Sequence, residues 1–408
     1  MMRSLWVTFH RWLGLAMAVF LFISGLTGAI ISWDHELDEW LNPQLFDAQT
    51  EQAEEQQFNA LALADLLEAD DPKVRVSFMS LTVEPGHSLL IGVDPKPHPE
   101  TGKAYELDYN QAAIDPTTGM VQAQRMWGDI SLAKENLLPF LYKLHYSMHI
   151  PDGFGIELGI LLMGIIGIVW AIDSFIALWI SFPKAKSWKK SFRFRWKQGG
   201  YKLNFDLHRS GGIWLWPLLL LLAVTSVSMN LEGQIMRPLV ALFSDITPSP
   251  FEQRLPTPMD EPTEPALTRQ EAVFIAEKEA TERGWTDPAG GIFYADHFDI
   301  YGVGFYQPGA DHGDSGLGNP WLYFDGQTGD YLGHWVPGTG SAGDIFLQAQ
   351  FPLHSGRILG LPGRIIISLM GLLVAMLSIT GIIIWAKKRR ARVFANSSQD
   401  LTLASDAI

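Results

Sequence analysis

The residues in this sequence best suited to chemistry are histidines placed beside long apolar runs. Four of them, His10, His145, His208 and His354, each stand near the start of a different run. Neutral imidazole ligates metal ions and exchanges protons near neutral pH. A lone histidine at the boundary of an apolar run is more often an interfacial residue than a ligand, but four runs that each carry one indicate paired ligands.

A fifth histidine, His149, comes four residues after His145 in the stretch KLHYSMHIPDG. In a helix these two imidazoles would lie one turn apart on the same face. Rings that point the same way cannot occupy opposite positions on one metal ion, so only one of them can be an axial partner of His354. The other is free to bond a propionate, to ligate a second group or to lie in the interface.

The sequence contains no cysteine among its 408 residues. This excludes disulfides, thiol catalysis, iron–sulfur clusters and covalent C-x-x-C-H haem. No G-x-G-x-x-G stretch opens a βαβ pattern, so no nicotinamide or flavin site is indicated. A redox cofactor must therefore be held by other ligands, and its electrons must come from an external donor, either cytoplasmic or in the quinone pool.

Four apolar runs, roughly 13–33, 154–182, 213–231 and 358–385, carry most of the hydrophobicity. Each is long enough to cross about 30 Å of hydrocarbon as a helix that rises about 1.5 Å per residue. The first run is longer than the apolar region of a signal peptide and no A-x-A-like site follows it, so we interpret it as an uncleaved anchor. The sequence predicts a membrane protein with a bundle of four transmembrane α-helices.

Basic residues cluster on one side of the runs: before the first, between the second and third, and after the fourth. Because such segments stay in the cytoplasm, both termini are predicted to be cytoplasmic. The segments 34–153 and 232–356 hold nearly all the carboxylates behind the net charge of −14 and are expected in a bacterial periplasm. We therefore expect a multi-pass inner-membrane protein in contact with lipids, whose basic clusters need no nucleic-acid partner.

The two outer segments contain similar patterns. The stretches AIDPTTGMVQAQR (113–125) and YFDGQTGDYLGHW (323–335) share D-x-x-T-G, in which the aspartate starts a turn and the glycine supplies the positive φ of a hairpin. A helix candidate precedes each pattern, at 60–68 and at 269–283. These features predict two small periplasmic α+β modules.

Other features of the outer segments are expected to be structural or to shape a binding surface. Thr268 and Glu271 form a capping-box pattern, the Pro-rich stretch 246–267 is interpreted as a tether, and DHGD at 311–314 resembles a loose metal site. Four aromatic residues either contact a bulky ligand or pack in the module cores. They are Trp127, Tyr306, Trp321 and Trp335.

The predicted orientation places the histidines at two levels. His10 and His208 fall at the cytoplasmic ends of their runs, whereas His145 and His354 fall at the outer ends. Bis-histidine haem needs two imidazoles on opposite faces of a planar macrocycle, most easily supplied by two helices. One haem near each face would divide the crossing into short electron transfers.

Charged residues accompany these histidines. Arg11, Arg209 and Arg357 lie beside or one turn from candidate ligands and can pair with haem propionates, although boundary arginines also reach toward lipid headgroups. Asp173 lies deep in the second run, where a carboxylate is costly in lipid and is expected to face a polar partner inside the bundle.

The chain resembles the PepSY-associated transmembrane-helix family from His10 to Arg392. The resemblance rests on the two D-x-x-T-G modules, which resemble PepSY domains, and on four stretches of the runs. These are FHRWLGL, LLMGIIGIVWAIDSFIALWISFP, FDLHRSGGIWLWPLLLLLAVTSVSMNL and FPLHSGRILGLPGRIIISLMGLLVAMLSITGIIIWAKKRR. Within the family the chain is most similar to siderophore-iron reductases of the bacterial inner membrane.

The resemblance implies two b-type haems that carry single electrons outward, reduce ferric siderophores in the periplasm and release Fe(II). It places the iron ligands at His10 and His208 for an inner haem and at His145 and His354 for an outer one, with His149 outside the simplest pattern. The implied segments are 1–33 (N-terminus and first span), 34–144 (first module), 145–182 (second span), 183–207 (basic loop), 208–231 (third span), 232–353 (second module), 354–386 (fourth span) and 387–408 (tail).

Two other functions remain open from the sequence. The modules can bind a peptide or protein, with the spans as anchors and no redox activity. Alternatively, the haems are present but the substrate is copper or another periplasmic oxidant.

Overall fold

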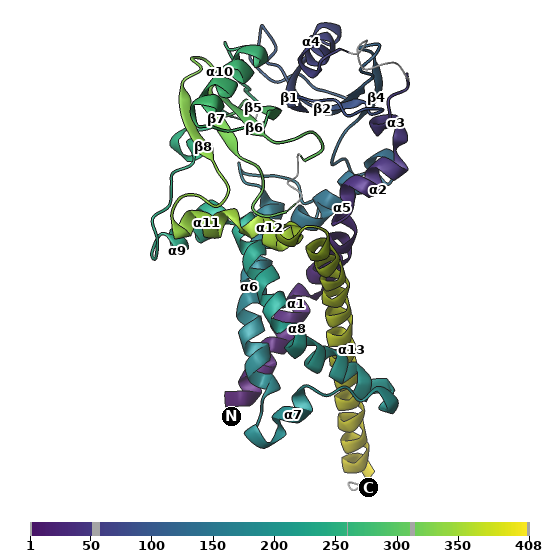
Figure 1. The fold of residues 1–408 in the computed structure, drawn as a ribbon. Helices are drawn as coiled ribbons and strands as arrows, with labels where there is room; N and C mark the ends of the chain where they lie inside the picture. Colours follow the sequence, from purple (N-terminus) through teal and green to yellow (C-terminus); the bar gives the residue numbers. More distant parts are fainter. Residues whose placement is uncertain (1, 51–57, 259, 311–314, 406–408) are drawn as a thin grey trace.

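The computed structural model describes residues 2–50, 58–258, 260–310 and 315–405 (Figure 1). A helical bundle forms the stem, a β-sheet domain lies at one end of it, and both chain termini lie near the other end. Short helices join the two parts. We call the two ends of the bundle the sheet end and the terminal end.

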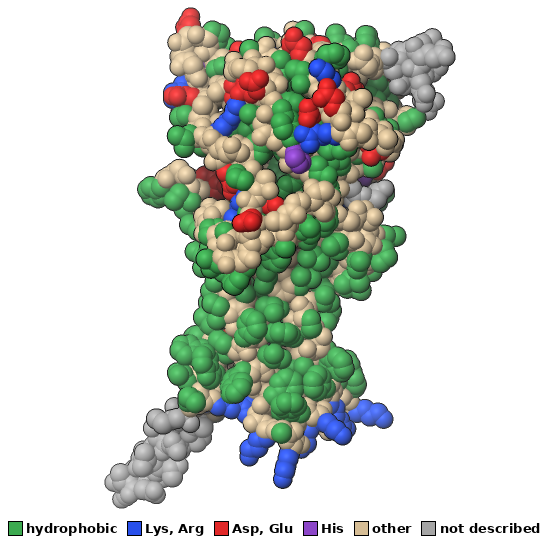
Figure 2. Space-filling model, turned by 60° about the vertical axis from the view of Figure 1, so that its left-hand side comes forward, with side chains coloured by type: hydrophobic (Ala, Val, Ile, Leu, Met, Phe, Trp, Pro, Cys, Tyr) green, Lys and Arg blue, Asp and Glu red, His purple; other side chains and the backbone are tan. Residues whose placement is uncertain are grey.

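Four long helices build the bundle: α1 (Met2–Ile31), α6 (Leu158–Ser181), α8 (Gly200–Asn230) and α13 (Leu361–Ser405). Each is long and apolar enough to cross a membrane, which confirms the four predicted spans of a multi-pass membrane protein. Apolar side chains cover the middle of the stem, Lys and Arg gather at the terminal end, and carboxylates lie over the sheet domain (Figure 2).

Glycines let the helices of the bundle approach closely. A Cβ on Gly25 of α1 would lie 2.6 Å from the carbonyl oxygen of Gly371 of α13, so these two helices cross backbone to backbone. On the other side of the bundle, Gly167 of α6 lies against Val227 of α8. Small residues at such crossings are typical of helix packing in membranes, where apolar side chains alone do not drive association.

The outer segments form one sheet rather than two separate modules. Its eight antiparallel strands run in the order β4-β3-β2-β1-β5-β6-β7-β8, so the two halves join where β1 pairs with β5. The strands are β1 (Val74–Ser80), β2 (Leu89–Pro95), β3 (Gln111–Ile114), β4 (Val121–Arg125), β5 (Ala289–Ala295), β6 (Ile300–Phe305), β7 (Trp321–Asp325) and β8 (Tyr331–Trp335). The two predicted modules therefore share one sheet. The long-range β1–β5 pairing leaves no local sequence pattern.

Each half carries one helix on the shared core. Buried residues of α4 (Ala60–Asp70) and α10 (Arg269–Glu282) belong to a single hydrophobic cluster with both halves of the sheet. The predicted capping box is present, because the Thr268 side chain accepts the backbone N–H of Glu271 while the Glu271 carboxylate accepts the N–H of Thr268. The α+β composition of each half was thus predicted correctly.

The two D-x-x-T-G stretches form the predicted hairpin turns. Asp115 accepts backbone N–H groups of the next turn residues between β3 and β4, and Asp325 does the same between β7 and β8. Gly119 and Gly329 have φ values of 70° and 75°, in the left-handed region that glycine adopts without strain. The two halves therefore repeat one local design.

The Pro-rich stretch is not a free tether. Arg254 donates to the carbonyls of Phe298 and Asp299 and pairs with Asp325, while the N–H of Thr257 donates to the carbonyl of His297. These bonds fix the stretch along the second half of the sheet domain. The predicted metal motif at 311–314 lies outside the described residues.

Short helices connect the sheet domain to the bundle and cap its terminal end. They are α2 (Asp34–Leu41), α3 (Pro43–Phe46), α5 (Lys134–Ser147), α7 (Trp188–Ser191), α9 (Arg237–Val240), α11 (Ala342–Gln348) and α12 (Gln350–Ser355). His145 lies on α5 and His354 on α12. The second and fourth spans begin only at α6 and α13, so the predicted starts of these spans at 145 and 354 were too early.

Candidate functional site

The structure brings the four histidines together as two pairs. The inner pair, His10 of α1 and His208 of α8, lies at the terminal end with ring centres 6.0 Å apart. The outer pair, His145 of α5 and His354 of α12, lies at the sheet end with ring centres 6.1 Å apart. In both pairs the two rings come from different helices, so they approach each other across the bundle.

Each ring of the outer pair is held through its Nδ1 atom by a threonine. The Nδ1 of His145 lies 3.1 Å from the Thr27 hydroxyl and donates to the carbonyl of Ser24 at 3.0 Å. The Nδ1 of His354 lies 2.8 Å from the Thr225 hydroxyl. Thr27 follows His10, and Thr225 follows His208, at the same spacing along their helices. Helices α1 and α8 thus each bear one inner ring and support one outer ring.

The rings of the inner pair are also held through Nδ1, but by different chemistry. The Nδ1 of His208 donates to the carbonyl of Leu377 at 3.0 Å and lies 3.2 Å from the Thr380 hydroxyl. The Nδ1 of His10 lies 2.9 and 3.0 Å from the two carboxylate oxygens of Asp173. Asp173 is 3 % exposed, so the polar partner expected for it inside the bundle is His10.

These contacts leave the same nitrogen of all four rings for a ligand. Within the described part of the chain, the hydrogen bonds of the four rings all go through Nδ1, and none reaches Nε2. A metal-bound histidine commonly uses its second ring nitrogen in this way, because that hydrogen bond fixes the tautomer and the ring orientation.

Two glycines make room for two of these rings. A Cβ on Gly28 would lie 2.8 Å from Cε1 of His145, and a Cβ on Gly381 would lie 3.0 Å from Cε1 of His208. Real Cβ atoms essentially never approach an atom below 3.0 Å, so a larger residue at Gly28 would displace the His145 ring. At Gly381 the fit is almost as tight.

Each pair borders a cavity. The inner cavity has a volume of about 380 Å³ and the outer cavity about 290 Å³, close to the lower end of the range for small-molecule sites. Leu21, Trp170 and Val374 line both cavities. The two cavities are therefore separated at these positions by a single layer of apolar side chains.

Arginines with incomplete hydrogen bonding line the inner cavity. Arg11 and Arg209 both line it, and the Nε atom of each is buried without a hydrogen-bond partner. Buried donors of this kind are costly unless a ligand or water satisfies them. Arg357 lines the outer cavity together with Asp34, and its Nη2 lies 3.9 Å from the Asp34 carboxylate.

Burial keeps the outer pair neutral. It lowers the pKa of His145 to about 4 and the pKa of His354 to about 3, because the charged ring would lose its hydration. At neutral pH both imidazoles therefore carry a lone pair, which is the form that ligates a metal ion.

His149 is not part of this arrangement. Helix α5 ends at Ser147, and Met148 and His149 have positive φ values of 55° and 52°, so the helical spacing expected between His145 and His149 is broken. The Nε2 of His149 donates to the carbonyl of Phe140 at 2.8 Å, and its ring stacks on the Phe140 ring. Pro151 was a signal for this early helix end.

The four aromatic residues singled out in the sequence lie in different surroundings: two pack in the core of the sheet domain, one is exposed at its edge, and one packs on a residue of the outer cavity. Tyr306 is 4 % exposed and packs against Trp321, as expected of core residues. Trp335 is 36 % exposed at the sheet edge on β8. Trp127 packs on Tyr142, which lines the outer cavity.

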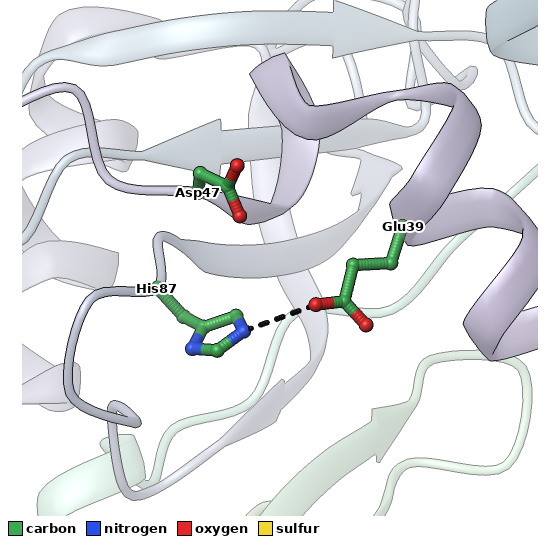
Figure 3. A group of neighbouring side chains, drawn as sticks. All are labelled: Glu39, Asp47 and His87. Carbon is green, nitrogen blue, oxygen red and sulfur yellow. Dashed lines mark hydrogen bonds and ion pairs between the residues drawn. The ribbon is translucent and has the colours of Figure 1, made fainter.

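The sequence analysis missed the side chains that support the rings. Thr27 and Thr225 stand at equal spacings from the two span histidines, and that repeat was the available signal. Outside both pairs, His87 lies beside Glu39 and Asp47 in a cluster whose ligand atoms are all within 4.8 Å of one another (Figure 3).

Comparison with known proteins gives one family. A search of curated proteins finds no match to this sequence. The family model described as "PepSY-associated TM region" matches residues 7–388, a range that contains both histidine pairs, the whole sheet, α6 and α8, and most of α1 and α13. The chain therefore belongs to the family of proteins with a PepSY-associated transmembrane region.

Proposed function

We propose that the protein is a dihaem reductase of the bacterial inner membrane that passes electrons outward to ferric siderophores and releases Fe(II) in the periplasm. The observation that supports it most is the arrangement of two facing histidine pairs, one toward each end of the bundle, with every Nδ1 held by the protein and every Nε2 left for a ligand.

The spacing of the rings suits a bis-histidine metal site. Imidazole nitrogens bind first-row metal ions at about 2.0–2.1 Å, and the ring centre lies roughly 1.1 Å behind the nitrogen, so two rings that share one ion can have centres up to about 6.3 Å apart. The observed separations are 6.0 and 6.1 Å. Each bound haem would supply a one-electron carrier between these rings.

The polar residues at the cavities suit the propionates of haem. Arg11 and Arg209 have buried Nε donors that carboxylates can satisfy at the inner cavity, and Arg357 is placed for the same contact at the outer one. These arginines would orient the macrocycle, and the apolar walls would exclude water. In this proposal His10 and His208 would hold the inner haem, and His145 and His354 would hold the outer one.

The layer between the cavities supports transfer across the membrane. Leu21, Trp170 and Val374 border both sites, so an electron needs to cross only this layer between them. The concentration of Lys and Arg at the terminal end supports a cytoplasmic position for that end (Figure 2). Electrons from a cytoplasmic or quinol donor would enter at the inner pair and leave at the outer pair, beneath the sheet domain.

Reduction releases iron because siderophores bind Fe(III) far more tightly than Fe(II). Adding one electron to the chelated ion therefore converts tightly bound Fe(III) into weakly bound Fe(II), which can dissociate. The protein needs no proton-transfer group for this step. Tyr142 and Tyr146 line the outer cavity at the side where the substrate would approach.

The test is anaerobic mixing of the purified, dithionite-reduced protein with a ferric hydroxamate siderophore, while a ferrous chelator traps Fe(II). We expect haem bands that reoxidise as Fe(II) appears. His354→Ala should abolish both signals, whereas His149→Ala, its matched control outside the cavity, should retain them. A colourless protein would refute haem binding. Reoxidation by cupric ions but by no ferric siderophore would refute the substrate and favour copper reduction.

A further inference from the structure

The cluster of Glu39, Asp47 and His87 brings three elements together at the base of the sheet domain (Figure 3). Glu39 lies on α2, Asp47 directly follows α3, and His87 lies two residues before β2. The Nε2 of His87 faces the Glu39 carboxylate at 3.4 Å, and their side chains are 37 % and 38 % exposed. All three side chains can reach solvent, so a small ion has access to the cluster.

The orientation of the His87 ring favours a cation at this position. Its Nδ1 lies 3.3 Å from the carbonyl of Pro85, which can only accept a hydrogen bond, so Nδ1 carries the proton. In the neutral ring Nε2 is then a lone pair directed at a carboxylate oxygen, and two acceptors repel each other. A cation between them, either a second proton on the ring or a metal ion, removes this repulsion.

The backbone holds the three side chains in place. Asp47 and His87 are opposite residues of an antiparallel bridge, flanked by hydrogen bonds from Ala48 to Gly86 and from Ser88 to Phe46 of 2.9 and 2.8 Å. Side chains of opposite residues in such a pair lie close together. Because the ligands are fixed before an ion arrives, little conformational entropy is lost on binding.

Helix α2 is fixed independently of this bridge. The buried carboxylate of Asp38 pairs with Arg125 of β4 at 2.7 Å and accepts from Asn42 at 2.7 Å. Glu39 is the next residue, so its backbone position is set by this buried contact. The third ligand is therefore held as firmly as the other two.

The ligand set indicates the kind of ion. One neutral imidazole and two carboxylates suit divalent first-row metals such as Mn²⁺, Fe²⁺ and Zn²⁺. Two ligand atoms that each lie about 2.1 Å from a metal are roughly 3.0–3.4 Å apart at octahedral or tetrahedral angles. The 3.4 Å between Nε2 of His87 and the Glu39 carboxylate fits this range. Water can complete the coordination sphere, because the cluster is partly exposed.

The cluster also lies close to the outer cavity. Asp34, which lines that cavity, is on the same helix as Glu39, five residues earlier. Five residues of α-helix span about 7.5 Å along the axis. An ion released at the outer cavity therefore has a short path to the cluster along α2, which carries a carboxylate at each end of that path.

We propose that Glu39, Asp47 and His87 bind a divalent first-row metal ion, and that this site receives the Fe(II) released at the outer cavity. The second half of the proposal rests on the proposed reductase function; the first half does not. In this scheme the site holds Fe(II) briefly at the sheet domain, which keeps it away from the iron-free siderophore.

Metal binding is tested with Mn²⁺ alone on the full-length protein, with free Mn²⁺ measured by electron paramagnetic resonance. We expect one saturable ion per chain, and His87→Ala and Glu39→Gln should each weaken its affinity at least about tenfold, since even outer-shell substitutions cost this much. His98→Ala, which removes another histidine of the sheet domain, should leave binding unchanged. Saturable binding that is equal in the wild type and His87→Ala, or no binding at all, overturns the site.

The product role has a separate readout. During siderophore reduction, a ferrous chelator should capture Fe(II) faster from His87→Ala than from the wild type, while haem content and the thermal midpoint stay equal. Equal capture rates overturn the product role but leave the Mn²⁺ result standing. If the protein binds Mn²⁺ but does not reduce ferric siderophores, the proposed function has failed and the metal site has not.

Discussion

Replacing Asp173 by asparagine should raise the reduction potential of the inner haem. The carboxylate of Asp173 lies within 3.0 Å of His10 Nδ1 through both oxygens and is buried in the bundle. It makes His10 a more electron-rich ligand and favours the ferric state, which carries one more positive charge than the ferrous state. The outer rings have only hydroxyl and carbonyl partners.

The size of the effect follows from the strength of this bond. Hydrogen bonds to charged groups contribute about 1.5–3 kcal/mol, and for one electron 59 mV corresponds to about 1.4 kcal/mol. If most of this hydrogen-bond free energy stabilises the ferric state, Asp173→Asn raises the reduction potential of the inner haem by roughly 60–130 mV. In the proposed dihaem protein the same charge would lower the reduction potential of the inner haem relative to the outer one, which would favour outward transfer.

A potentiometric titration of the Soret band measures both haems at once. Asparagine keeps the shape of the side chain and one oxygen that can accept the Nδ1 proton, so both haems should stay bound and only the lower potential should move. Asp173→Ala removes the partner of His10 altogether and should also reduce the haem content. Two unchanged potentials in Asp173→Asn, or a shift confined to the outer haem, would refute the reasoning.

Four further substitutions test other parts of the structure. Gly28→Val and Gly381→Val should each remove one haem, because the new side chain displaces a histidine ring, and haem quantification would detect this. Arg75→Ala should cost about 3–5 kcal/mol of stability and lower the thermal midpoint, because it leaves Asp296 buried without its ion-pair partner at the junction of the sheet halves. Burial, and then the nearby charge of Asp296, raise the pKa of Asp94. Stability from that group is thus present at low pH and lost as the pH rises through its folded pKa, so Asp94→Asn should raise the midpoint at pH 7 but not at pH 3.

The sequence was most informative where one segment determines its own structure. The four spans could be predicted from the long apolar runs, and a hairpin turn could be predicted from Asp115 and Gly119. Both features depend on local composition and backbone preference. The pairing of β1 with β5 depends on residues more than 200 positions apart and leaves no such pattern. The error at His149 has a local cause, since the four-residue spacing suggested a helix that in fact ends before Pro151.

The candidate site was predictable only in part for the same reason. The residue types and positions of His10, His208, His145 and His354 along the chain were enough to indicate ligand pairs. Their supports are contacts between helices: Asp173 meets His10, and Thr27 meets His145, only once the bundle has packed. Likewise, no sequence spacing relates His87 to Glu39 and Asp47, because the bridge that joins them forms between distant segments.

Haem stoichiometry in His208→Ala and His354→Ala tests the central claim most directly. If each pair holds its own haem, the wild type contains two haems per chain, and each variant loses one of them or converts it to a high-spin form. The other haem should remain low-spin and reducible, since the pairs lie on different helix ends. His149→Ala should keep both haems. Full low-spin haem content in both ligand variants, or loss of a haem in His149→Ala, would contradict the assignment of the two pairs.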